Sequence, residues 1–261
     1  AVFSPDGLQV VLTGSHDATA KLWCVDSGEC LRTFTGHTGF VISAVLSLDG
    51  QRVLTGSEDK TAKVWCVDSG ECLRTFECPG PGMWVLFAVF SPDGIHVLTG
   101  SVDLTPKLWC VPSGEFLRTF EGHGDCVHSA VFFPDGQQVL TGSDDKTAKL
   151  WLTPSGECLR TFQGHNEAVR SIVLSPNGQQ VLTGSDDAMA KLWCVASGEC
   201  LHTFEGHSGE VRFAVLSLDG QLVLTGSDDK TAKLWCVESG ECLRTLEGHR
   251  DEVVSAAFSR H

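Results

Sequence analysis

The phrase Leu-Thr-Gly-Ser-X-Asp recurs six times in this chain, and each copy is followed by a Trp six residues after its Asp. Four of the five intervals between these Trp residues are 42 residues and one is 44; the residues are Trp23, Trp65, Trp109, Trp151, Trp193 and Trp235. A fixed period of this length indicates stacked supersecondary units, none of which buries its apolar face alone. The repeat therefore predicts one continuous domain over residues 1–261.

One copy of the repeat, residues 122–163, shows how each unit is expected to fold. Its apolar stretches are five to seven residues long, rich in Val, Leu, Phe and Thr, and bounded by Gly, Pro, Asp or Ser. No segment has the length or period of a helix. Turns such as Asp93-Gly94 and Ser69-Gly70 supply the positive φ angles that tight hairpins need. Each unit is predicted to be a four-stranded antiparallel meander, and radial repetition of such units protects their edges.

Three motifs recur together in fixed order: Gly-His before the first strand, Leu-Thr-Gly-Ser-X-Asp in the second, and Lys-Leu-Trp in the third. In these motifs the chain resembles the WD40 repeat family across its whole length, although the Asp that the family places after Trp is Cys or Leu here. The resemblance implies an all-β fold, a six-bladed WD40 β-propeller with four antiparallel strands per blade.

The two ends of the chain carry parts of one blade. The first copy begins with only Ala1-Val2-Phe3 where its innermost strand belongs, and Gly248-His249 followed by residues 252–258 reads as a first strand with nothing after it. We expect this C-terminal strand to complete the first blade, as terminal closure in the family implies. Residues 1–4 nevertheless duplicate residues 256–259, so one terminus frays or the chain is a fragment of a longer array.

The recurring His, Thr, Asp and Trp invite a catalytic interpretation. The family resemblance implies instead a hydrogen-bonded structural tetrad in each blade, and a site repeated this often is unlike a single active site. The predicted tetrads are His37, Thr55, Asp59 and Trp65; His123, Thr141, Asp145 and Trp151; His165, Thr183, Asp187 and Trp193; His207, Thr225, Asp229 and Trp235; and, across the termini, His249 with Thr13, Asp17 and Trp23.

The third copy departs from this pattern. It keeps Thr99, Asp103 and Trp109, but residues 77–82 (Glu-Cys-Pro-Gly-Pro-Gly) replace its Gly-His loop. We expect this blade to be the least rigid.

Twelve Cys residues fall mostly at two places of the repeat, after the Trp and at the start of the fourth strand. A three-residue turn such as Asp26-Ser27-Gly28 places Cys24 opposite Cys30, within reach of a disulfide in principle. Two copies break the pair with Leu152 and Phe116, as a buried apolar site tolerates, so reduced thiols in an intracellular protein, cytoplasmic or nuclear, are expected. Two Cys per blade are too few for zinc, and neither metal nor cofactor is predicted.

Charge restricts the partners. The chain has 33 acidic and 19 basic residues and a net charge of −14, which opposes binding to nucleic acid or an anionic membrane. It has no apolar run near 18 residues and no signal-like leader. We expect a monomer whose partner is a protein or peptide, basic and with an apolar anchor.

Positions that vary between the copies indicate where a partner binds. By the resemblance, the loop after Gly-His and the residue before the tetrad Asp lie on the top rim of the propeller. An apolar group of predicted partner-binding residues consists of Phe40, Ile42, Met83, Trp84, Leu86 and Val102, and a charged group consists of His128, Arg170 and Arg212 among acidic residues. Trp84 alternatively packs on the inserted Pro-Gly loop, and the Arg residues alternatively neutralise neighbouring acids.

The sequence therefore predicts a non-enzymatic scaffold that binds a protein or peptide on the top face. Two alternatives stay open: a structural propeller within a larger multidomain signalling protein, and a propeller-type enzyme. The enzyme alternative rests on Cys126 and His128, the one non-repeated nucleophile and base pair. No catalytic residue is predicted.

Overall fold

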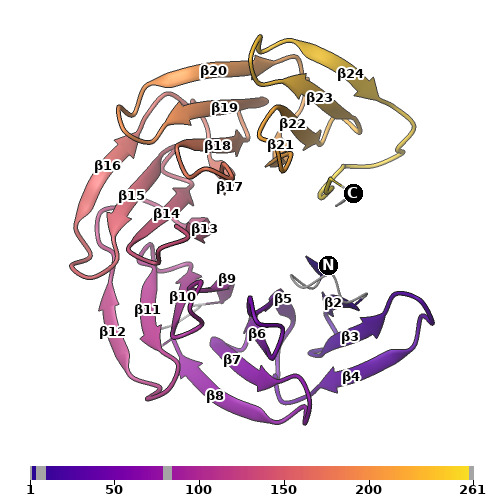
Figure 1. Ribbon diagram of the computed structural model, residues 1–261, viewed down its shortest axis with the longest axis vertical. Coiled ribbons are helices and arrows are strands. Elements are labelled where there is room, and N and C mark those ends of the chain that lie inside the picture. The colour runs from indigo at the N-terminus through magenta and orange to yellow at the C-terminus, as the bar shows by residue number, and fades with distance from the viewer. Residues whose placement is uncertain (1, 4–9, 79–83, 259–261) are drawn as a thin grey trace. The chain divides into compact units, whose positions relative to one another are not determined.

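Short antiparallel strands make up the regular structure of the computed structural model, which describes residues 2–3, 10–78 and 84–258. Six four-stranded sheets are formed within these ranges. They fall into two compact units, residues 1–122 and 123–261, which are described separately. In Figure 1 the first unit runs from indigo to magenta and the second from magenta to yellow.

The first unit contains three sheets, each in chain order. The first sheet is β1 (Val2–Phe3), β2 (Val10–Gly14), β3 (Ala20–Cys24) and β4 (Cys30–Phe34). The second is β5 (Val41–Leu46), β6 (Arg52–Ser57), β7 (Thr61–Cys66) and β8 (Cys72–Glu77). The third is β9 (Val85–Phe90), β10 (His96–Ser101), β11 (Lys107–Cys110) and β12 (Phe116–Thr119).

The second unit repeats the arrangement three more times. Its first sheet is β13 (Val127–Phe132), β14 (Gln138–Ser143), β15 (Ala148–Leu152) and β16 (Cys158–Phe162). The next is β17 (Val169–Leu174), β18 (Gln180–Ser185), β19 (Met189–Cys194) and β20 (Cys200–Glu205). The last is β21 (Val211–Leu216), β22 (Leu222–Ser227), β23 (Ala232–Cys236) and β24 (Cys242–Leu246).

The turns form where the sequence supplies left-handed backbone. Gly94 and Gly70, in the Asp-Gly and Ser-Gly turns, have φ of 66° and 76°. Lys60 adopts a φ of 71° without being Gly. Asp59 holds that turn, because its Oδ1 accepts the backbone N–H of Thr61 at 3.0 Å and the Thr61 hydroxyl at 2.6 Å.

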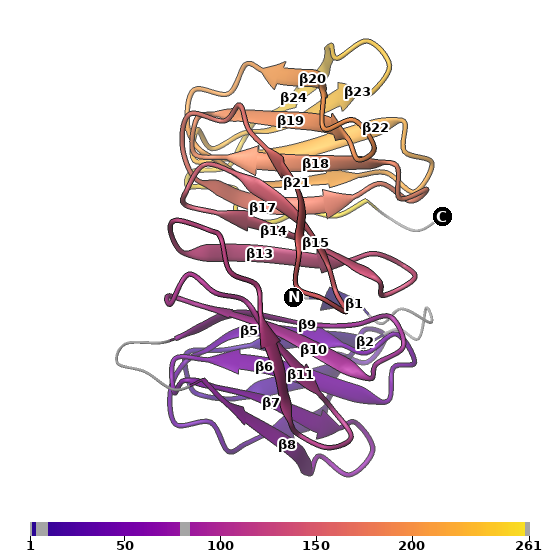
Figure 2. The ribbon, with the colours of Figure 1, turned by 90° about the vertical axis from the view of Figure 1, so that its left-hand side faces the viewer.

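Consecutive sheets within a unit pack face to face through their apolar side chains. In the first unit, Leu54 and Phe76 of the second sheet are buried against Val97 and Trp109 of the third. Figure 2 shows β5 to β8 and β9 to β11 of this unit from the side. The Gly of the recurring phrase permits the close approach, since a Cβ on Gly56 would lie 2.8 Å from Cγ1 of Val85.

An arginine on the outermost strand ties three of the sheets to the following sheet of the same unit. Arg32 of β4 donates through Nε and Nη2 to the backbone carbonyl of Asp68 at 2.9 and 2.6 Å. Arg74 of β8 reaches the carbonyl of Pro112, and in the second unit Arg160 of β16 reaches the carbonyls of Ala196 and Ser197. We call this contact the arginine clamp.

These observations confirm the all-β class and the six four-stranded meanders, and the strand predicted at residues 138–143 coincides with β14. One expected strand differs. Val2 and Phe3 of the N-terminus pair with Leu12 and Val11, in the innermost position of the first sheet, and the segment 252–258 forms no strand. Its Val253 instead packs on Phe213 of the last sheet. Closure into one ring and a single domain over residues 1–261 stay predictions.

Within residues 2–3, 10–78 and 84–258, no helix has the length and apolar character that a membrane span requires.

Candidate functional site

The predicted tetrad residues of the second sheet meet in one hydrogen-bonded chain. The Trp65 indole N–H donates to Thr55 Oγ1 at 2.9 Å, and His37 Nε2 lies 2.7 Å from the same oxygen. His37 Nδ1 lies 2.7 Å from Asp59 Oδ2. Since Asp59 can only accept and Trp65 can only donate, the consistent direction has Nδ1–H donating to Asp59 and the Thr55 hydroxyl donating to Nε2.

The surroundings of His37 and Asp59 favour a neutral imidazole and an ionised carboxylate. Burial lowers the pKa of His37, although the hydrogen bond and charge of Asp59 oppose it, and this favours the neutral imidazole. Burial alone would raise the pKa of Asp59. Hydrogen bonds from Thr61, from the backbone N–H of Thr38 and from His37 outweigh burial and lower it. The carboxylate therefore binds donors from two loops, the one that contains Thr38 and the one that contains Thr61.

Three sheets of the second unit contain the same chain of contacts. The distances from His Nδ1 to the Asp carboxylate are 2.7 to 2.8 Å, and those from His Nε2 to Thr Oγ1 have the same range. The residues are His123, Thr141, Asp145 and Trp151; His165, Thr183, Asp187 and Trp193; and His207, Thr225, Asp229 and Trp235.

An apolar patch lies at one end of the sheets in the first unit. Phe40 and Ile42 are 41% and 42% exposed, and Trp84 and Val102 are 47% and 40% exposed. The His16 ring stacks on Phe40 with centroids 4.3 Å apart. Trp84 and Val102 flank the same end of the third sheet, because Val85 pairs with Ser101. We call these five residues the apolar rim.

Two predicted members of the apolar group lie differently. Leu86 is partly buried, and Met83 lies outside the described residues. His16, which the predicted set of partner-binding residues lacks, belongs to the patch through its stacking on Phe40. The stack joins neighbouring sheets, a contact that no spacing within one repeat indicates.

The charged group of the second unit forms an internal ion-pair network. Arg170 binds Asp144 at 2.8 Å and Asp186 at 2.6 Å. Arg212 binds Asp228 at 2.6 Å and Glu210 at 2.9 Å. The Arg170 guanidinium is thus shared between two carboxylates. That of Arg212 is shared between three, because its Nη1 also lies 3.8 Å from Asp186 Oδ1. The two side chains are 27% and 31% exposed. This geometry matches the alternative in which the Arg residues neutralise their neighbours.

The family profile described as "WD domain, G-beta repeat" matches the chain six times, at residues 1–24, 28–66, 70–110, 114–151, 156–194 and 198–236. The chain belongs to the WD40 repeat family. The His, Thr, Asp and Trp contacts described above occur in four of the six sheets of this WD40 chain, the second, fourth, fifth and sixth.

Similar curated proteins align with this WD40 chain over about one repeat. The F-box/WD repeat-containing protein sel-10 of Caenorhabditis elegans is 48% identical over 42 residues, 16% of this chain and 7% of the relative. The human WD repeat-containing protein 86 is 51% identical over 41 residues, 16% of this chain and 11% of the relative. Ribosome assembly protein 4 of Chaetomium thermophilum is 45% identical over 49 residues, 19% and 10% respectively. The matched part spans about a tenth of these relatives.

The third WD40 sheet replaces the imidazole with other groups. Trp109 still donates to Thr99 Oγ1 at 2.9 Å, but the buried Cys78 Sγ lies 3.7 Å from that oxygen. Asp103 is paired with Lys107, which is only 9% exposed. Burial raises the pKa of the Cys78 thiol. Residues 79–82 of the inserted loop lie outside the described residues.

The first WD40 sheet has its Thr, Asp and Trp in place. Trp23 donates to Thr13 Oγ1 at 2.9 Å, and Asp17 accepts the Thr19 N–H at 2.9 Å. His249, the expected fourth member, is exposed, and its assignment to this sheet stays a prediction.

The twelve cysteines of this WD40 chain all lie among the described residues, and none of them is in a disulfide. The expectation that those opening the fourth strands are buried is wrong: Cys30, Cys72, Cys158, Cys200 and Cys242 are exposed, and Phe116 at the same place is 51% exposed. The cross-strand partner of Cys30 is Trp23 rather than Cys24, because a bulge interrupts the pairing there.

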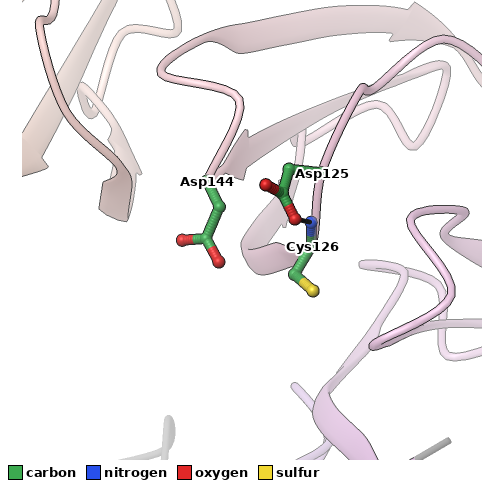
Figure 3. Close-up of side chains that lie close together, drawn as sticks. All are labelled: Asp125, Cys126 and Asp144. Atoms are coloured by element: carbon green, nitrogen blue, oxygen red, sulfur yellow. Dashed lines mark hydrogen bonds between the residues drawn. The ribbon is translucent and has the colours of Figure 1, made fainter.

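One cluster of possible metal ligands occurs among the described residues: Asp125, Cys126 and Asp144, with ligand atoms within 4.8 Å of one another. Figure 3 shows the Asp125 carboxylate folded onto the backbone N–H of Cys126, at 2.8 Å. Asp144 is bound by Arg170 and lies 2.8 Å from His128 Nε2. The carboxylates are thus already engaged, and we assign no metal here.

The same cluster bears on the enzyme alternative. Burial, reinforced by the negative charges of Asp125 and Asp144, raises the pKa of Cys126. An activated nucleophilic Cys has the opposite shift. His128 is directed to Asp144 and to Nη1 of Arg170, which lies 2.8 Å from its Nε2.

Proposed function

We propose that this chain is a non-enzymatic protein-interaction scaffold whose partner binds at the apolar rim of the first unit. WD40 repeats and the WD-repeat relatives support an interaction scaffold in general. The observation that carries the finer proposal is the group of exposed apolar side chains at one end of consecutive sheets, Phe40, Ile42, Trp84 and Val102, with the His16 ring stacked on Phe40.

The residues around Phe40 suit an anchor residue of a partner. Phe40 is held in place, because its carbonyl accepts the Glu58 N–H at 3.0 Å and its ring stacks on His16. Aromatic side chains fixed in this way lose little conformational entropy on binding and dominate interface energetics. An apolar anchor on the partner therefore fits this patch.

Basic character in the partner fits the charge of the chain. The net charge is −14, and Glu58 lies beside the patch. In the second unit, carboxylates already surround Arg170 and Arg212, so these two side chains offer little to an anionic partner. Complementary charge raises the association rate and selects against acidic partners.

The test compares two double variants in a pull-down with quantitative mass spectrometry. Phe40→Ala with Trp84→Ala removes two side chains of the apolar rim and is expected to reduce partner recovery by about tenfold or more. The matched control is Leu48→Ala with Ile95→Ala, which truncates side chains 65% and 45% exposed in turns of the same two sheets. Equal recovery with both double variants would refute the apolar rim as the binding site.

A structural role within a larger protein is the second candidate. Its support is the kind of protein that this chain resembles over about one repeat. One of these relatives is itself called a ribosome assembly protein. If the control and the apolar-rim variant behave alike in the pull-down, this candidate gains support.

A further inference from the structure

A hydrogen-bonded group of three side chains lies on the solvent side of the second sheet. Lys63 Nζ donates to Thr75 Oγ1 at 3.0 Å, and Cys72 Sγ lies 3.6 Å from the same oxygen. Cys72 and Thr75 are both exposed on the outermost strand, β8. One hydroxyl therefore bridges an amine and a thiol. We call this group the outer triplet.

The outer triplet occurs in five of the six sheets. The distance from Lys Nζ to Thr Oγ1 is 2.9 to 3.0 Å in every copy, and that from Cys Sγ to Thr Oγ1 is 3.6 to 3.9 Å. The other copies are Lys21, Thr33 and Cys30; Lys149, Thr161 and Cys158; Lys191, Thr203 and Cys200; and Lys233, Thr245 and Cys242.

The third sheet is a natural negative control. Phe116 stands where the other sheets have Cys, and Lys107 turns to Asp103 instead of Thr119. The Thr119 hydroxyl donates to Glu121 at 3.3 Å. The triplet is therefore not an automatic product of strand geometry, because it requires the Cys and a Lys that is free of a carboxylate.

We infer that the outer triplets are self-acylation sites, in which an exposed Cys accepts an acyl group from a small acyl thioester and passes it to the neighbouring Lys. None of the residues involved belongs to the apolar rim. The inference is therefore independent of the proposed interaction function.

The reaction needs no oxidant and no metal. The Cys72 thiolate attacks the carbonyl carbon of the acyl thioester, the carbon–sulfur bond of the donor breaks, and the donor leaves as a thiolate. The Lys63 amine, after losing its extra proton to water, then attacks the same carbon. The carbon–nitrogen bond forms, the bond to Cys72 breaks, and the proton on nitrogen passes to sulfur through the Thr75 hydroxyl. The products are an amide and the original thiol.

Geometry makes the Lys of a triplet a better target than a more exposed Lys. A thiolate is the strongest nucleophile among the side chains, and holding amine and thioester together replaces a bimolecular step with an intramolecular one. Lys60, Lys146 and Lys230 are exposed in the turns that follow β6, β14 and β22. Direct acylation from solution favours these three, whereas transfer through Cys favours the triplet lysines.

The experiment treats the intact chain with acetyl-coenzyme A and measures the acetylation rate of each Lys by mass spectrometry. In the wild type, we expect the triplet lysines to react about tenfold or more faster than Lys60, Lys146 and Lys230. In Cys72→Ser, the rate at Lys63 should fall to that of the turn lysines while Lys21 is unchanged. Cys66→Ser, in the same sheet, is the matched control and should change nothing.

A second variant detects the intermediate. In Lys63→Arg the acetyl group has no amine to reach, so a thioester that neutral hydroxylamine cleaves should accumulate on Cys72. The inference is overturned if Lys63 keeps its rate in Cys72→Ser, or if the turn lysines of the wild type react as fast as the triplet lysines. Circular dichroism establishes that each variant is folded.

Discussion

The second and third sheets of the first unit have the same Trp-to-Thr contact but surround it with different groups. In the second sheet, the Thr55 hydroxyl meets the imidazole of His37, which Asp59 binds from the other side. In the third, the Thr99 hydroxyl meets the thiol of Cys78, and Asp103 turns to Lys107. A buried indole N–H thus needs one acceptor, which is the Thr hydroxyl in both sheets. The groups that contact this hydroxyl from the other side can differ between sheets, provided that every buried charge keeps a partner.

The comparison teaches that the two sheets have different weak points. The polar chain of the second sheet contains one charge, on Asp59, which several neutral donors surround. The third sheet instead contains a nearly buried ion pair between Asp103 and Lys107. Such pairs tolerate the loss of one partner poorly.

The largest effect is expected from Asp103→Asn in the third sheet. It leaves the ammonium group of Lys107, which is 9% exposed, without a counter-charge, and the free energy of unfolding should fall by about 3–5 kcal/mol. Urea denaturation measures this. Adding Lys107→Met should restore most of the loss. If the single variant costs less than about 1 kcal/mol, the ion pair is not the weak point that the comparison assigns to this sheet.

An intermediate effect is expected from His37→Ala in the second sheet. It leaves the Thr55 hydroxyl and the Asp59 carboxylate each without one partner, and should lower the free energy of unfolding by about 1–3 kcal/mol. Cys78→Ala in the third sheet is the matched change, and should cost about 1 kcal/mol because a thiol makes only weak hydrogen bonds. Equal losses from the two variants would remove the distinction between imidazole and thiol.

The smallest effect is a difference in pH dependence. The pKa of His37 is lowered below its ordinary 6.5, so its imidazole binds a proton in the unfolded chain at a higher pH than in the folded one. The contribution of His37 to the free energy of unfolding is therefore present above pH 6.5 and is lost as the pH falls. The pKa of Cys78 is raised above 9.0, so its contribution is present below pH 9 and lost as the pH rises.

Hydrogen exchange, corrected for intrinsic rates, should therefore show the second sheet losing protection at pH 5 and the third at pH 9.5. His37→Gln should remove the acid loss from the second sheet alone. An unchanged acid loss in that variant would exclude His37 as its source. Asp59 and Asp103, whose pKa values are both lowered, lose their contribution to stability only as the pH falls below their ordinary 3.8. The same data at pH 7 test whether the third sheet is the least rigid.

The repeat predicted the strands, and the resemblance to the WD40 family predicted the contacts around Trp65; both lie within one copy. Contacts between copies were harder to predict. The stacking of His16 on Phe40 joins two sheets, and Cys78 substitutes for an imidazole from a different place in its loop. The exposure of Cys72 was not predicted for another reason. On an outermost strand, side chains alternate between two faces, and the sequence does not show which face packs against another sheet. Phe116 is likewise exposed at the same place in its sheet.

The arginine clamp has a consequence for how such an array can change over generations. Its acceptors are backbone carbonyls, of Asp68 for Arg32, of Pro112 for Arg74 and of Ala196 for Arg160. Every residue type carries that carbonyl, so the link places no demand on the side chain of the turn it holds. A duplicated copy can therefore accumulate substitutions in these turns and still remain fastened to the copy before it.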